Sequence, residues 1–128
     1  MKSAFISDGY TREGYIAETE FYPAARIQYR PATVQERIVI KDKIAREALR
    51  RDATAGEKLL NDWIVTHLLK WDVKDEDGRD VSITSENLGR LNPAFGFRLH
   101  AILMGDSICD TDPETGESGT DEKQATKN

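Results

Sequence analysis

The sequence has few of the residues that catalytic and metal sites use, with one cysteine and two histidines among 128 residues. The single cysteine, Cys109, cannot form an internal disulfide, and a zinc site needs three or four ligands that the chain does not assemble. No apolar run approaches the roughly 20 residues needed to span a bilayer. The first eight residues hold only the apolar pair Phe5-Ile6 before an acid, so no secretory segment is expected. We therefore expect a soluble cytoplasmic protein with no membrane association, metal ion or cofactor.

The chain also lacks a cluster of positive charge. Its net charge is −5; residues 106–128 hold seven acids and two bases, whereas the remaining 105 residues hold 16 acids and 16 bases. Binding to nucleic acid without sequence preference requires clustered Lys and Arg that displace counterions. An electrically neutral body therefore predicts no nucleic-acid partner.

A period-two pattern of aromatic and β-branched residues runs from Tyr15 to Tyr29. It predicts two short strands interrupted near Pro23, as either an open hairpin or one bent ribbon. Two strands alone are marginally stable, so a helix is expected to cover them. The preceding residues 1–14 show no period and are predicted to be a flexible arm.

The first long helix is predicted to begin at Thr33. The residue before Pro31 is excluded from helical geometry, and Thr33 with Glu36 has the spacing of a capping box. Apolar residues then fill about half of the helical wheel, and charged residues lie opposite. The expected core face consists of Val34, Ile38, Ile40, Ile44, Ala45, Ala48 and Leu49.

A second helix is predicted from about Glu57 to Lys70, after Gly56. That glycine is compatible with a break or with a helix interior, and we favour a tight turn or kink there. This helix is apolar on two sides, so one side must be covered by something other than the first helix. We hypothesise a partner-binding surface formed by Leu59, Trp63, Val65, Leu69 and Trp71.

The C-terminal third is predicted to contain a short hairpin and two short helices. Asp77-Gly78 suits the turn of a hairpin over residues 71–83, Thr84 and Asn92 are N-cap candidates, and Gly105 suits a helix end. Residues 106–128 are polar and acidic, and are expected to be disordered. The predicted fold is mainly α with a small β component, in one domain over residues 15–105.

None of the candidate chemical sites has a complete set of residues. Read as a calcium loop, the turn with Asp75 and Asp77 has Val73 and Thr84 at its anchoring positions, where carboxylates are required. His67 lies on an apolar stripe, which indicates a hydrogen-bonded core histidine. No carboxylate pair is singled out for acid–base catalysis. We therefore expect no catalytic, metal or cofactor site, and a protein that is not an enzyme.

Several segments nevertheless resemble a known group of proteins. They are the Tyr-Arg-Pro at residues 29–31, the Trp-Asp at 71–72, the Asp-Gly at 77–78, and Thr-Ser-Glu-Asn-Leu at 84–88 followed by Leu-Asn-Pro at 91–93. Over roughly residues 25–105 the chain is similar to the tail assembly chaperones of long-tailed, siphovirus-like bacteriophages and to related small proteins of phage tail regions.

The resemblance implies a role in virion assembly in the host cell cytoplasm. Such chaperones bind the helical tape-measure protein, recruit tail-tube subunits, and are absent from the finished tail. Surplus apolar surface also fits a homo-oligomer. Two alternatives are a structural virion component, such as a head–tail connector or minor tail protein, and a small regulatory binding module.

Overall fold

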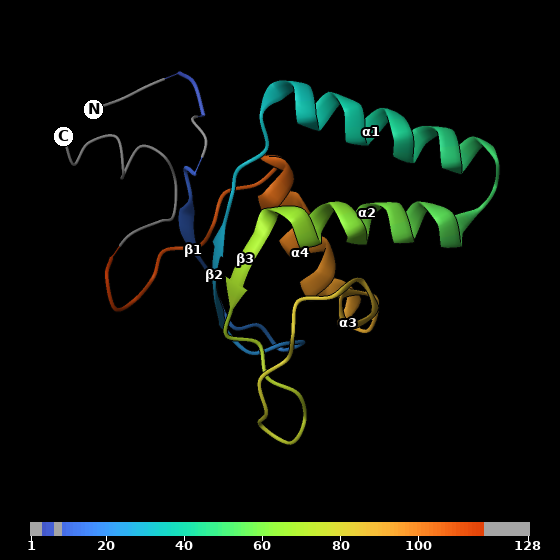
Figure 1. Ribbon diagram of the computed structural model, residues 1–128. Coiled ribbons are helices and arrows are strands. Elements are labelled where there is room, and N and C mark those ends of the chain that lie inside the picture. The colour runs from blue at the N-terminus through green and yellow to red at the C-terminus, as the bar shows by residue number, and fades with distance from the viewer. Residues whose placement is uncertain (1–3, 7–8, 117–128) are drawn as a thin grey trace.

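Four helices and a small antiparallel sheet make up the part of the chain that the computed structural model describes, residues 4–6 and 9–116 (Figure 1). This architecture confirms the predicted fold class, mainly α with a small β component. The elements in chain order are β1 (Arg12–Ile16), β2 (Ala25–Tyr29), α1 (Val34–Leu49), α2 (Ala53–His67), β3 (Leu68–Trp71), α3 (Ser85–Gly89) and α4 (Pro93–Met104).

The sheet begins with the predicted pair of strands. β1 and β2 are antiparallel, and their ladder runs from the pair Arg12↔Tyr29 to the pair Ile16↔Ala25. Alternate residues of both strands are buried on one face, as period-two patterning requires. β1 starts inside the segment predicted to be a flexible arm, because pairing with the end of β2 extends the ladder back to Arg12.

A third strand replaces the predicted end of the second helix. α2 ends at His67, and residues 68–71 form β3, which pairs antiparallel with β2 through Ile27↔Trp71 and Gln28↔Lys70. The prediction of helix up to Lys70 is therefore wrong. Large apolar residues such as Leu68 and Trp71 suit a strand as well as a helix. Residues 68–71 form a strand because they pair with the open edge of β2.

The turn between the two long helices lies before Gly56. Arg51 adopts a left-handed backbone conformation with φ 57°, and the Asp52 carboxylate caps α2 by accepting from Ala55 N at 3.0 Å. Gly56 is therefore a residue of the first turn of α2, and the favoured break at that glycine is corrected. Asp52 has the side chain that an N-cap requires. Helix α2 therefore begins at residue 53, whereas the predicted start was residue 57.

The core lies between the sheet and the helices α2 and α4. Fully buried side chains come from β1 (Ile16), α2 (Ile64) and α4 (Leu99 and Leu103). α1 contributes Ile40 as its buried residue. The expectation that the whole apolar half of this helix faces the core is therefore wrong. The α1–α2 hairpin projects past the rest of the body, so little protein is available to cover α1 (Figure 1).

The two short C-terminal helices form where the capping residues predict. Thr84 Oγ1 accepts from Asn87 N, and Asn92 Oδ1 accepts from Ala94 N. Gly105 ends α4 in a left-handed conformation with φ 81°, which glycine adopts without a Cβ penalty. The predicted hairpin at residues 71–83 is reduced to one bridge, Lys74↔Asp80, around a turn at Gly78.

Residues 106–116 pack against the sheet rather than leaving the body at Asp106. Asp110 N donates to Tyr15 O at 2.9 Å, and Ala17 N donates to the Asp110 carboxylate at 2.8 Å. Cys109 is buried against β1, and Arg26 Nη2 pairs with the Asp112 carboxylate at 3.0 Å. The predicted start of the disordered tail is therefore too early, because these partners are remote in sequence. Residues 117–128 lie outside the described residues.

Candidate interaction surface

The base of the α1–α2 hairpin is held by a cluster of charged side chains. The Glu36 carboxylate accepts from Arg30 Nη2 at 3.1 Å and lies 3.3 Å from His67 Nε2. Its other oxygen accepts from Thr33 N at 3.0 Å, and Thr33 Oγ1 accepts from Glu36 N at 3.1 Å. This is the predicted capping box, extended by contacts to the end of β2 and to the end of α2. The start of α1 is thereby fixed relative to both.

The ionised form of Glu36 is strongly favoured in this cluster. Burial alone would raise the pKa of this carboxyl group, but the Thr33 N–H and the Arg30 guanidinium together lower it from 4.5 to about 2. Hydrogen bonds to a carboxylate and a nearby positive charge both favour its charged form. His67 points its other ring nitrogen, Nδ1, at Trp63 O at 2.9 Å. Glu36 and His67 therefore both have structural partners, which fits the interpretation of His67 as a core residue.

Two of the hypothesised partner-binding residues lie together in a groove between α1 and α2. Leu59 and Trp63 line this groove, which has a volume of about 570 Å³, together with Val39 and Ile40 of α1. The Trp63 ring stacks on His67, with 4.0 Å between ring centroids and 22° between planes. Leu59 and Trp63 are half-buried, so only part of their apolar surface is available to a partner.

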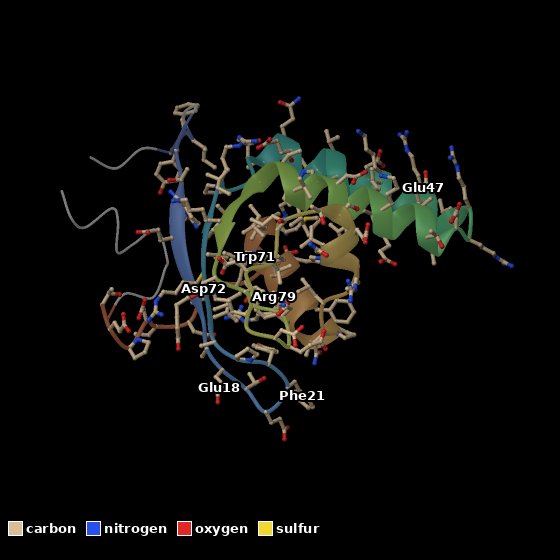
Figure 2. All side chains as sticks on the ribbon, turned by 60° about the horizontal axis from the view of Figure 1, so that its bottom comes forward. Glu18, Phe21, Glu47, Trp71, Asp72 and Arg79 are labelled. Atoms are coloured by element: carbon tan, nitrogen blue, oxygen red, sulfur yellow. The ribbon has the colours of Figure 1, made fainter. Side chains whose placement is uncertain are left out.

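The other three hypothesised residues lie elsewhere. Val65 on α2 is 36% exposed and Leu69 on β3 is 47% exposed, and neither lines the groove that holds Leu59. Trp71 is half-buried against the core, and its Nε1–H donates to Val81 O at 2.6 Å (Figure 2). The five residues therefore do not form one continuous surface. Trp71 has a structural role within the fold.

A larger exposed apolar surface lies on α1, where the sequence predicts core. Val34 is 77% exposed, Ile38 63% and Leu49 84%, and Ala45 is also exposed. Helical positions separated by four and seven residues share one side of the cylinder, so these four side chains form a single stripe. We call Val34, Ile38, Ala45 and Leu49 the α1 stripe. The helical periodicity identified it, but periodicity does not say whether a face is covered.

A second apolar groove runs between the hairpin and α4. Two adjoining hollows of about 490 and 310 Å³ share Ile44 of α1, Leu60 of α2, and Phe97 and His100 of α4. Phe97 is exposed at this groove. Burial lowers the pKa of His100, which favours its neutral form there. The groove therefore adds apolar area on one side of the hairpin.

The residues considered from the sequence as chemical sites have structural contacts in the described part of the chain. No three His, Cys, Asp or Glu side chains within 4–6 and 9–116 are grouped to hold a metal ion. Asp75 of the acidic turn accepts from Asp77 N at 2.9 Å and from Arg79 N at 3.0 Å, so it serves the turn itself. Cys109 is a buried free thiol, and burial raises its pKa. A raised pKa disfavours the reactive thiolate.

No helix in the described part of the chain combines the length and apolar content needed to cross a lipid bilayer. Comparison with protein-family models, with curated protein sequences and with solved structures finds no match to this chain.

Proposed function

We propose that this chain is a non-enzymatic binding protein that covers an amphipathic helix of another protein during virion assembly. In its specific form, the proposal is a tail assembly chaperone of a long-tailed phage. It would bind tape-measure protein, recruit tail-tube subunits, and leave the finished tail. The specific form depends on the sequence segments that resemble such chaperones.

The observation that carries the proposal is the exposed apolar surface of the helical hairpin. Val34, Ile38 and Leu49 are mostly exposed on a helix that projects from the body. Contiguous exposed apolar patches on soluble proteins mark interaction sites. Burying a Val, Leu or Ile side chain fully contributes about 1.5–3 kcal/mol, from which the entropy cost of association must be subtracted. A few such side chains therefore support reversible binding.

Co-expression with a tape-measure protein tests this function. We expect the wild-type chain to keep tape-measure protein in the soluble fraction and to co-purify with it. The double variant I38S/L49S should lose most of this effect. F21S is a matched control, because Phe21 is also exposed but lies in the loop between β1 and β2, away from the hairpin (Figure 2). Tape-measure protein that stays insoluble with the wild-type chain would contradict the proposed chaperone.

Purified virions separate the chaperone from a structural virion component. A chaperone should be absent from particles by quantitative mass spectrometry, whereas a connector or minor tail protein should be present in a fixed ratio to tail-tube subunits. Recovery of the chain at such a fixed ratio would contradict the chaperone function and support a structural virion component. The exposed hairpin would then be an interface in the particle.

A further inference from the structure

The larger hollow of the groove between the hairpin and α4 has walls from all four helices. Its volume is about 490 Å³, within the range of about 300–1,000 Å³ that is usual for small-molecule sites. Apolar side chains form most of its lining, which is also typical of such sites. The larger of them are Ile44, Leu60, Leu88, Leu91 and Phe97. The hollow therefore has the size and the apolar lining that suit a small molecule.

One polar side chain in this wall is buried without a hydrogen-bond partner. Asn61 of α2 is 4% exposed, and it lines the hollow. Its side-chain amide makes no hydrogen bond within residues 4–6 and 9–116. Buried polar groups in folded proteins are nearly always hydrogen-bonded, because an unpaired one costs stability. The Asn61 amide therefore has an unused donor and an unused acceptor at the wall of the groove.

A carboxylate without an ion pair lies at the same end of the groove. Glu57 precedes Asn61 by four residues, so the two side chains share one face of α2. Both reach Gly89 of α3, where an added Cβ would lie 3.0 Å from Glu57 Oε1 and 3.7 Å from Asn61 Nδ2. Glu57 has no ion pair within the described residues, and its neighbour Lys58 pairs with Asp62 at 2.7 Å. No Lys or Arg is among the described residues that line this hollow, so its charge is negative.

From this arrangement we infer that the groove binds a small apolar molecule that ends in a positively charged amine. The apolar body lies against the leucines and Phe97 of the wall, and the ammonium group reaches the Glu57 carboxylate and the Asn61 amide oxygen. An ammonium group donates hydrogen bonds and accepts none, which suits these two acceptors. The inference goes beyond the proposed function, and the hollow is lined by no residue of the α1 stripe.

The same features disfavour other occupants of this groove. A ligand that ends in a carboxylate or a phosphate would place negative charge beside Glu57, and juxtaposed like charges oppose association. A purely apolar molecule would cover the wall but leave the Asn61 amide without a partner, which costs affinity. Ordered water would pair with Asn61 but leave the apolar wall uncovered. An apolar amine satisfies the wall, the amide and the carboxylate together.

Binding of three probe molecules with one apolar body to the full chain tests the inference. The probes are phenylpropylamine, phenylpropanol and phenylpropionate, whose end groups are positive, neutral and negative at pH 7. By NMR titration of isotope-labelled protein, we expect the amine to bind about tenfold tighter than the carboxylate, with the alcohol between them. The side-chain amide signals of Asn61 should shift as the amine is added. Raising the salt concentration should reduce the difference between the probes, because screening weakens exposed charge pairs.

Four variants assign the binding to this groove. N61L removes the amide and should weaken amine binding about fivefold without lowering the unfolding temperature, because it removes an unpaired buried polar group. E57Q should weaken binding of the amine about threefold and leave binding of the alcohol unchanged. F97S shortens an exposed part of the apolar wall and should weaken binding of all three probes. E20Q, which changes an exposed acid in the loop between β1 and β2, should leave binding unchanged.

Each other result overturns the inference. Equal binding of the amine and the carboxylate would remove the role of Glu57, and unchanged amine binding by N61L would remove the role of the amide. Failure of all three probes to bind would exclude a small-molecule site of this chemistry. A dimer seen by light scattering and abolished by F97S would assign the groove to a second copy. The co-expression experiment is separate, since I38S/L49S changes no residue that lines this hollow.

Discussion

At the scale of single residues, Glu36 stabilises the fold through its charge. Its folded-state pKa of about 2 lies below its ordinary value of 4.5. The contribution is therefore fully present above about pH 4.5 and is lost as the pH falls toward 2. E36Q keeps the side-chain shape and removes the charge. We expect it to lower the free energy of unfolding by about 1 kcal/mol at pH 7, allowing for solvent screening at this partly exposed site.

Urea unfolding of wild type and E36Q at pH 7, 4 and 3 measures this contribution. The difference between the two proteins should shrink steadily as the pH falls. E20Q in the exposed loop between β1 and β2 should differ little from wild type at every pH. A difference for E36Q that grows toward pH 3 would show that the sign of the coupling is wrong.

Gly14 and Cys109 form a second contact between single residues. A Cβ added at Gly14 would overlap the Cys109 sulfur, and overpacking a core typically costs about 1–3 kcal/mol. We expect G14A to destabilise the chain by about 2 kcal/mol. C109A should recover a large part of that loss in the double variant, because it removes the sulfur. A thermal-unfolding cycle of the four proteins checks this coupling, and purely additive effects would contradict the contact.

At the scale of elements, α1 is predicted to be stabilised by one buried side chain. Ile40 is 2% exposed, and Ile38, two residues away, is 63% exposed. Truncating a buried isoleucine to alanine costs about 2–5 kcal/mol, whereas surface substitutions usually stay within about 0.5 kcal/mol. We therefore expect I40A to lose about 2–4 kcal/mol and I38A to stay near wild type in chemical denaturation. Equal losses would mean that the α1 stripe is covered within the monomer.

The starts of α1, α3 and α4 were predictable because their signals are local. Thr33, Thr84 and Asn92 each accept from a backbone N–H two or three residues ahead, so the sequence around each cap contains the whole interaction. The end of α2 was not predictable in this way. Leu68–Trp71 becomes a strand because β2 lies beside it, and that neighbour is about 40 residues away in the chain.

The sequence also does not determine which apolar residues of α1 are buried, and the reason is related. An apolar stripe of helical period shows that one face is suited to burial, but not what covers it. Val34 and Ile40 are both apolar members of the predicted core face, yet Ile40 is buried and Val34 is exposed. The apolar pattern therefore predicted surplus apolar surface on the second helix, where Val65 is exposed. It did not predict the larger exposed apolar surface on α1.

At the scale of the whole molecule, the segment after α4 is anchored to the edge strand β1 by an isolated bridge between Asp110 and Tyr15. Asp110 accepts from Ala17 N, and its other carboxylate oxygen accepts from Arg98 Nη2 at 3.1 Å. Removing one partner from a part-buried hydrogen bond typically costs about 1–3 kcal/mol. We expect D110A to destabilise the full chain by about 1–2 kcal/mol in thermal unfolding. T111A, an exposed neighbour, should have little effect, and a D110A protein as stable as wild type would show that the segment is not structurally integrated.

The proposed binding function requires that another polypeptide covers the α1 stripe. Site-specific photo-crosslinking during co-expression with tape-measure protein tests this most directly, with a photoreactive phenylalanine analogue in place of Ile38, or of Phe21 as the control. We predict a cross-link to tape-measure protein from position 38 and none from position 21. Cross-linking from position 21 alone, or from neither position while the two proteins still co-purify, would contradict the claim that this helix face is the binding surface.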